Sequence, residues 1–150
     1  MDIKSKEERS RNMAGIRSKD TKPEMFIRSL LHSKGYRFRV NNKDIFGKPD
    51  IYFSKKQIAV FIHGCYWHRH MRCKYSYTPK SNVEFWQTKF NANILRDKTV
   101  KSHLQHEGIR ILIIWECTIK KMMRHEEFSN SVFQEITAFF NDTAMDYQEL

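Results

Sequence analysis

The sequence contains only three prolines, five glycines and three cysteines in 150 residues. Because proline and glycine are so scarce, no linker or low-complexity tract divides the chain, and a single domain over residues 1–150 is expected. No apolar run approaches the roughly 20 residues of a membrane-spanning helix, and the first residues do not resemble a signal peptide, so a bacterial cytoplasmic protein without a membrane partner is expected. The odd number of cysteines argues against a set of disulfides and leaves metal ligation or free thiols.

Acidic residues are also in the minority, with 17 Asp and Glu against 27 Lys and Arg, which gives a net charge of +10 and a pI near 9.6. A compact domain this basic indicates a polyanionic partner, nucleic acid first and an anionic membrane surface second. Hydrophobic residues make up 40% of the chain, which is enough for a buried core and unlike a disordered sequence. Charge alone indicates nothing about catalysis.

The order of hydrophobic patterns predicts an α/β domain in which helices flank a mixed β-sheet. The predicted helices cover residues 5–14, 21–34, about 82–106 and about 125–141. The predicted strands cover residues 36–40, 50–53, 57–62 and 109–115. The basic segment 1–20 is expected to contact DNA, and the tail 142–150 is expected to be frayed.

Residues 63–73, HGCYWHRHMRC, place three histidines and two cysteines within eleven positions. Zinc prefers four sulfur or nitrogen ligands in a tetrahedron. Cys65, His70 and Cys73 have a spacing that one loop can wrap around an ion, and Cys117, just past the strand at 109–115, is the natural fourth ligand. The alternative is three unrelated free cysteines and a histidine-rich surface loop.

The Pro49–Asp50 dipeptide lies where a loop enters a strand, and the next strand delivers Ile62 and His63 to the same region. Many metal-dependent nucleases place such a dipeptide on one strand and an acid-x-Lys triplet on the next, where the carboxylate and a backbone carbonyl hold magnesium. Here the triplet would be Phe61-Ile62-His63, which lacks both the acid and the lysine. Most Pro-Asp dipeptides are simply turns, so this pair alone is weak evidence.

Asp97 falls on the apolar stripe of the long predicted helix, and a carboxylate that faces inward needs a partner. His68 could supply one, and such a His–Asp pair can serve as a general base. The alternative places Asp97 on the solvent rim, paired with Arg96 or Lys101. Glu24 likewise has two interpretations: a capping box with Thr21, or an acid that reaches the water shell of a metal.

Tyr66, Trp67 and Trp86 are large rings on or beside a basic, exposed loop. Rings of this kind can wedge between base steps, which costs least at a mismatch. The alternative is ordinary core packing, above all for Trp86, and Trp115 in the strand at 109–115 is assigned to the core.

Together these residues resemble the very-short-patch repair (Vsr) endonucleases over roughly residues 5–125. The matching stretches are RSRNMAGIRSKDTKPE, FGKPDIYF, AVFIHGCYWHRH, EFWQTKFNANILRD and GIRILIIWEC. The resemblance implies a restriction-endonuclease-like core with a structural Zn²⁺ and a Mg²⁺-dependent nick on the 5′ side of a thymine mispaired with guanine. It also implies a nucleoid-associated monomer acting on double-stranded DNA, with mismatch-repair proteins and a companion cytosine methyltransferase as partners.

The resemblance assigns a role to each matching residue. Asp50 would bind Mg²⁺ together with the backbone carbonyl of Ile62, His63 would contact the scissile phosphate, and His68 with Asp97 would activate water, with Glu24 as an acid near this cluster. The zinc ligands would be Cys65, His70, Cys73 and Cys117, and the intercalating rings Tyr66, Trp67 and Trp86. Ile62 stands where the family has threonine, Tyr66 replaces phenylalanine, and the loop between His70 and Cys73 is one residue longer.

Two other functions are compatible with the residues alone. One is a zinc-stabilised DNA-binding module without catalysis, and the other is a restriction nuclease of the same fold that cuts matched DNA.

Overall fold

The computed structural model describes residues 20–150, which form an α/β domain with a five-stranded mixed sheet in the order β1-β2-β3-β4-β5. The strands are β1 (Arg39–Val40), β2 (Ile51–Phe53), β3 (Ile58–His63), β4 (Arg110–Trp115) and β5 (Tyr147–Glu149). The helices are α2 (Lys22–Ser33), α3 (Val83–His106), α4 (Glu116–Arg124) and α5 (Glu126–Asn141). The predicted helix at 5–14 and nearly all of the basic segment 1–20 lie outside the described residues. Within residues 20–150, no helix is long and apolar enough to cross a membrane.

The sheet changes from antiparallel to parallel pairing at its centre. Strands β1, β2 and β3 pair antiparallel in sequence, whereas β4 lies parallel to β3 and β5 parallel to β4. A parallel neighbour requires a crossover connection, and α3 supplies it between β3 and β4. In this arrangement the ends of β3 and β4 lie at the same edge of the sheet, and His63 pairs with Trp115 there.

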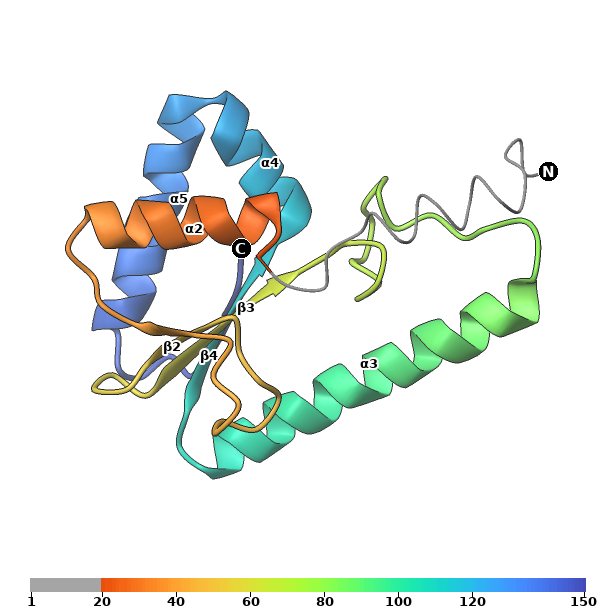
Figure 1. Ribbon diagram of the computed structural model, residues 1–150, viewed down its shortest axis with the longest axis horizontal. Helices are drawn as coiled ribbons and strands as arrows, with labels where there is room; N and C mark the ends of the chain where they lie inside the picture. The colour runs from red at the N-terminus through yellow and green to blue at the C-terminus, as the bar shows by residue number, and fades with distance from the viewer. Residues whose placement is uncertain (1–19) are drawn as a thin grey trace.

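Helices cover both faces of the sheet, as Figure 1 shows, with α2, α4 and α5 on one side and the long α3 on the other. Successive residues of β3 alternate between two buried clusters, as side chains of a strand must. Ile58 and Val60 pack with α2, α4 and α5, whereas Ala59 and Phe61 pack with Leu104 of α3. Burial on both faces explains why β3 and β4 are continuous apolar runs.

The prediction about the end of the chain is wrong. The tail 142–150 is not frayed, because β5 pairs with β4 and the Leu150 N–H donates to the Ile113 carbonyl at 2.8 Å. The guanidinium of Arg110 further binds the carbonyls of Phe139, Asp142 and Met145.

Two other elements differ from the prediction. Helix α4, which begins directly after Trp115, was not predicted at all. The strand expected at 36–40 is reduced to its last two residues.

Candidate active site

A tight loop holds Asp50 at the start of β2. Gly47 and Lys48 have positive φ angles of 81° and 50°, and a Cβ on Gly47 would lie 2.5 Å from Cγ1 of Val100 on α3. Only glycine lets the loop pass this close to the helix. Because β2 runs antiparallel to β3, Asp50 reaches the end of β3, where the Ile62 N–H donates a 2.7 Å hydrogen bond to Oδ2. The predicted proximity of the Pro-Asp dipeptide to this strand end is confirmed.

The Asp50 carboxyl is costly to ionise in the metal-free protein. Burial raises its pKa from 3.8 to about 7, the Ile62 N–H opposes this shift, the neighbouring Glu24 carboxyl adds to it, and the Arg28 guanidinium lowers it. Two acidic groups in one buried place favour a proton or a cation between them. A hard divalent cation, which prefers oxygen ligands, would stabilise the two ionised carboxylates in place of the proton.

Glu24 completes the predicted capping box and also lines the cavity. Its Oε2 accepts hydrogen bonds from the backbone N–H groups of Asp20 (2.6 Å) and Thr21 (3.4 Å), and the Thr21 side chain accepts from the Glu24 N–H, which completes the capping box. Arg28, one helical turn later, lies 3.4 Å from the same oxygen and 2.7 Å from Asp20. The side chain is nevertheless buried beside Asp50, so the cap also delivers a carboxylate to the cavity.

His68 and Asp97 form the pair that the first interpretation of Asp97 predicts. Nδ1 of His68 lies 2.8 Å from Oδ2 of Asp97, and the two side chains are 30% and 28% exposed. When Nδ1–H donates to Asp97, Nε2 is free to accept a proton from water. The His63 ring stacks on His68 with centroids 3.8 Å apart and planes 4° from parallel. Burial and the neighbouring His68 lower the pKa of His63 to about 3, against the opposing effect of Asp97, so His63 is neutral at neutral pH.

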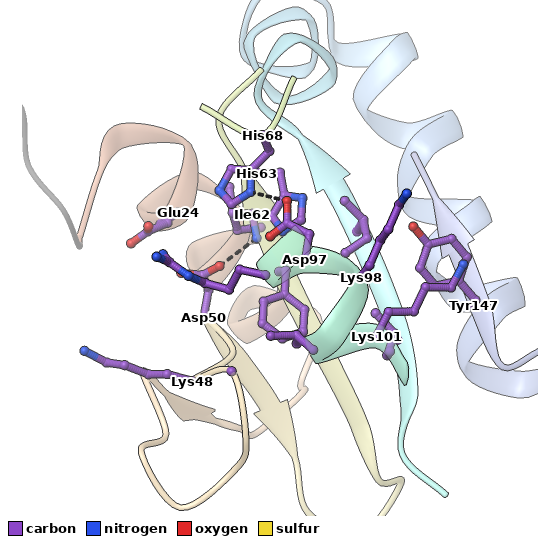
Figure 2. Close-up of a pocket in the computed structure, with 16 residues that line it drawn as sticks. Glu24, Lys48, Asp50, Ile62, His63, His68, Asp97, Lys98, Lys101 and Tyr147 are labelled. Atoms are coloured by element: carbon purple, nitrogen blue, oxygen red, sulfur yellow. Dashed lines mark hydrogen bonds and ion pairs between the residues drawn. The ribbon is translucent and has the colours of Figure 1, made fainter. Parts of the chain in front are cut away.

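A cavity of about 440 Å³ lies between the sheet edge and α3, and the groups described above that line it are Glu24, Asp50, Ile62, His63, His68 and Asp97. Figure 2 shows Asp50 and Glu24 on one side of it and the stacked His63 and His68 with Asp97 on the other. Four cationic side chains share the lining: Lys48, Arg96, Lys98 and Lys101. A carboxylate, a polarised imidazole and a basic rim are the parts needed to hold a phosphodiester and activate water against it.

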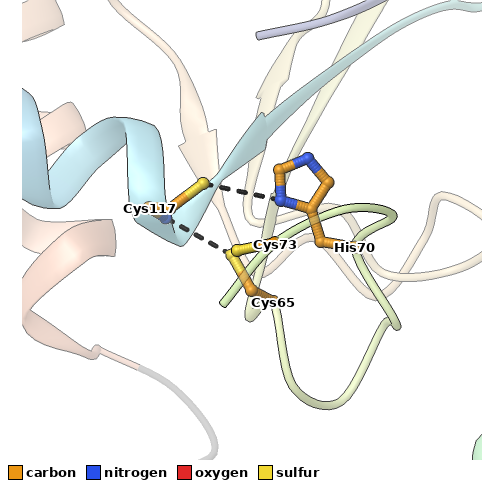
Figure 3. Close-up of side chains that lie close together, drawn as sticks. All are labelled: Cys65, His70, Cys73 and Cys117. Atoms are coloured by element: carbon orange, nitrogen blue, oxygen red, sulfur yellow. Dashed lines mark hydrogen bonds between the residues drawn. The ribbon is translucent and has the colours of Figure 1, made fainter. Parts of the chain in front are cut away.

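The four predicted zinc ligands come together beside this cavity (Figure 3). Their donor atoms all lie within 4.8 Å of one another, and Cys117 Sγ is 3.5 Å from His70 Nδ1. Such spacing suits the edges of a zinc tetrahedron, since Zn–S and Zn–N bonds are about 2.3 and 2.0–2.1 Å. Burial raises the pKa of the Cys65 thiol to about 12 and that of Cys117 in the same direction. Burial thus favours the protonated form of the Cys65 and Cys117 thiols when no metal is bound. The longer loop does not displace His70 from the cluster.

The three aromatic side chains form one cluster at the start of α3. Tyr66 lies 5.0 Å from Trp67 and 5.9 Å from Trp86, measured between ring centroids, and Trp67 is 5.9 Å from Trp86. The Asn93 amide holds the loop by donating to the Trp67 carbonyl at 3.1 Å. All three rings are half-buried, so they support each other and still present a face to solvent. Trp115 is buried in the core, as predicted.

Sequence reasoning overlooked several residues of the cavity. Lys98 follows Asp97 directly on α3, but adjacent residues of a helix do not share a face, so helical spacing did not indicate that Lys98 lines the cavity. Arg28, which contacts Glu24 but does not line the cavity, could have been found from its position four residues after Glu24. Tyr147 had no such signal, because it reaches the cavity only through the pairing of β5 with β4.

Comparison with known proteins agrees with this geometry. A family model described as DNA mismatch endonuclease Vsr matches residues 1–74. The type II nicking enzyme V.XorIIP of Xanthomonas oryzae is 43% identical over 118 residues, which is 79% of this chain and 86% of that protein. The type II nicking enzyme V.NmeAIP of Neisseria meningitidis is 41% identical over 135 residues, 90% of this chain and 96% of that protein. The DNA mismatch endonuclease Vsr of Escherichia coli is 39% identical over 119 residues, 79% of this chain and 76% of that protein. The chain belongs to the Vsr family of DNA mismatch endonucleases.

Proposed function

We propose that this DNA endonuclease nicks one strand of a duplex on the 5′ side of a thymine mispaired with guanine, in a Mg²⁺-dependent hydrolysis that starts very-short-patch repair. The observation that carries the proposal is the meeting of Asp50, His63 and the His68–Asp97 pair in one cavity. We assign the domain to the restriction-endonuclease-like fold on the position of Asp50 at the edge of the mixed sheet. The names of the relatives support a mismatch as the substrate and a nick as the product.

The donor set beside Ile62 suits magnesium. The Asp50 carboxylate and the Ile62 backbone carbonyl would hold the ion, and Glu24, whose carboxyl neighbours that of Asp50, would hydrogen-bond its waters. Backbone ligation would make isoleucine acceptable at position 62, since only the main chain would be needed. When bound, Mg²⁺ polarises a phosphoryl oxygen and neutralises developing charge. Ionised Asp50 is then favoured despite its burial.

The two histidines have different roles in the proposed reaction. His68, oriented by Asp97, takes a proton from the attacking water through Nε2. His63, which burial keeps neutral, donates a hydrogen bond to the scissile phosphate without adding a charge. The cations at the rim, such as Lys48 and Lys98, contact phosphates along the strand and give binding a strong dependence on salt.

The sulfur-rich cluster suits structural zinc, because three thiols and an imidazole are the soft donors of a closed tetrahedral site. Cys65, His70, Cys73 and Cys117 would hold it, and it would fasten the loop that carries Tyr66, Trp67 and His68 to the start of α4. The aromatic cluster then inserts at the mispair, where unstacking costs least.

A nicking assay tests the proposal. Duplexes that carry a single T:G pair, each other mismatch or no mismatch are incubated with the protein with and without Mg²⁺. Nicking of the thymine strand only, at T:G only and with Mg²⁺ only, is expected. Asp50→Asn should abolish cutting and leave duplex binding intact, with Asp44→Asn on an exposed loop as the control. Cutting of matched duplexes would instead indicate a restriction nuclease, and binding without cutting under every condition would indicate a DNA-binding module.

A further inference from the structure

Strand β5 brings two side chains to the active-site face of the sheet. Tyr147 lines the cavity, and the Lys101 ammonium lies 3.6 Å from its ring centre. Glu149, two residues on and therefore on the same face, accepts a 2.8 Å hydrogen bond at Oε1 from the Trp115 indole N–H. Gln148 lies between them and faces the opposite side. Figure 2 shows Tyr147 beside Lys98 and Lys101 at the far side of the cavity from Asp50.

The Trp115 ring lies between the candidate zinc cluster and the candidate catalytic histidines. It stacks on His70 with centroids 4.1 Å apart and planes 7° from parallel. Its edge contact with His63 has centroids 5.3 Å apart and an angle of 74°. Since His63 stacks in turn on His68, and His68 binds Asp97, one continuous series of contacts leads from a zinc ligand to the general base.

The hydrogen bond to Glu149 determines how the indole is oriented within this series. Trp115 is 7% exposed, and a buried indole N–H needs an acceptor. Stacking alone leaves a ring free to slide and turn in its own plane, whereas a directional bond at Nε1 prevents this. The acceptor comes from a strand that lies 34 residues further along the chain.

We propose that Trp115, held by Glu149 of β5, is a positioning residue for the nicking reaction. It fixes the His63 ring and, through it, the His68 ring against Asp97, so that the catalytic rings are aligned before DNA arrives. The inference rests on the proposed function, because it takes His63 and His68 as the catalytic groups. Small displacements of a catalytic group can lower a rate by about a hundredfold, and the loss of one supporting bond should lower it by about tenfold.

The test compares three substitutions on β5. Glu149→Leu removes the acceptor, Glu149→Gln keeps an acceptor oxygen of the same reach, and Gln148→Leu is the control on the opposite face. For Glu149→Leu, kcat for nicking should fall about tenfold with KM for the duplex and bound zinc per chain unchanged. Glu149→Gln and Gln148→Leu should stay within about twofold of the parent. Trp115→Phe removes the donor together with part of the ring that contacts His63, so it should lower kcat at least as much as Glu149→Leu.

Ring ¹⁵N NMR of the DNA-free protein separates this inference from the proposed function. Glu149→Leu should shift the ring signals of His63 and His68, and Gln148→Leu should not, whatever duplex the protein cuts. A Glu149→Leu variant that loses thermal stability while kcat and the histidine signals stay at parent values would overturn the positioning role. A Glu149→Gln variant as slow as Glu149→Leu would also overturn it, because the negative charge of Glu149 and not its hydrogen bond to Trp115 would then determine the rate. If the parent cuts no T:G duplex but the histidine signals shift as expected, only the proposed function fails.

Discussion

Replacing Asp50 with asparagine should stabilise the magnesium-free protein at alkaline pH while it abolishes nicking. The pKa of Asp50 is raised from 3.8 to about 7 by burial, so the folded protein binds this proton more tightly than the unfolded chain does. At pH values below 3.8 the carboxyl is protonated in both states, so it costs the folded protein no stability. The free energy of unfolding then falls as pH rises from 3.8 to about 7. Asparagine has the same shape, can accept the Ile62 N–H and never ionises.

The shift of about 3 pH units corresponds to at most about 4 kcal/mol of lost stability above pH 7, at about 1.4 kcal/mol per unit. At pH 5.5 about half of this loss is already present, because the unfolded carboxyl is then fully ionised. The advantage of Asp50→Asn over the parent should accordingly grow by up to about 2 kcal/mol between pH 5.5 and pH 8.5. Differences between the two side chains that do not depend on pH cancel in this comparison.

Urea denaturation without Mg²⁺, at several pH values between 5.5 and 8.5, measures the effect, with Asp44→Asn as a control on an exposed carboxylate. Saturating Mg²⁺ at pH 8.5 should raise the free energy of unfolding of the parent and leave that of Asp50→Asn unchanged. A pH-independent difference between Asp50→Asn and the parent would refute the reasoning, and so would equal stabilisation of both proteins by Mg²⁺.

Three other outcomes are expected. His68→Ala and Asp97→Asn should each lower the nicking rate by roughly 10²–10³ with duplex binding retained, and the double variant should be no slower than the slower single one; additive losses would contradict a paired base. Removal of zinc with a chelator, or Cys117→Ser, should lower the melting temperature, and an unchanged melting curve in protein shown to lack zinc would count against a structural site. Gly47→Ala should cost roughly 1–3 kcal/mol of stability because its Cβ meets Val100, and Val100→Ala in the same chain should recover part of that loss; no recovery would locate the strain in the backbone alone.

The amino-acid sequence by itself determined several of the elements that surround the site. The Thr21 cap and Glu24 begin α2, and the apolar runs of β3 and β4 are long enough to be central strands buried on both faces. These features follow from contacts between residues close in the chain or from burial alone, which leave a periodic pattern. The composition of the loop that begins at Gly64 likewise indicated a metal cluster.

Tertiary structure alone decided which of these parts meet. Asp97 had two equally good interpretations from the sequence, and only the packing of α3 against the sheet places it 2.8 Å from His68. Strand β5 has no alternating apolar pattern and owes its existence to the free edge of β4, so its residues carried no local signal. Glu149 could therefore not be connected with Trp115 from the sequence. Hydrogen bonds between distant segments depend on where whole elements pack, and that information lies in the combined burial of all the elements rather than in any one of them.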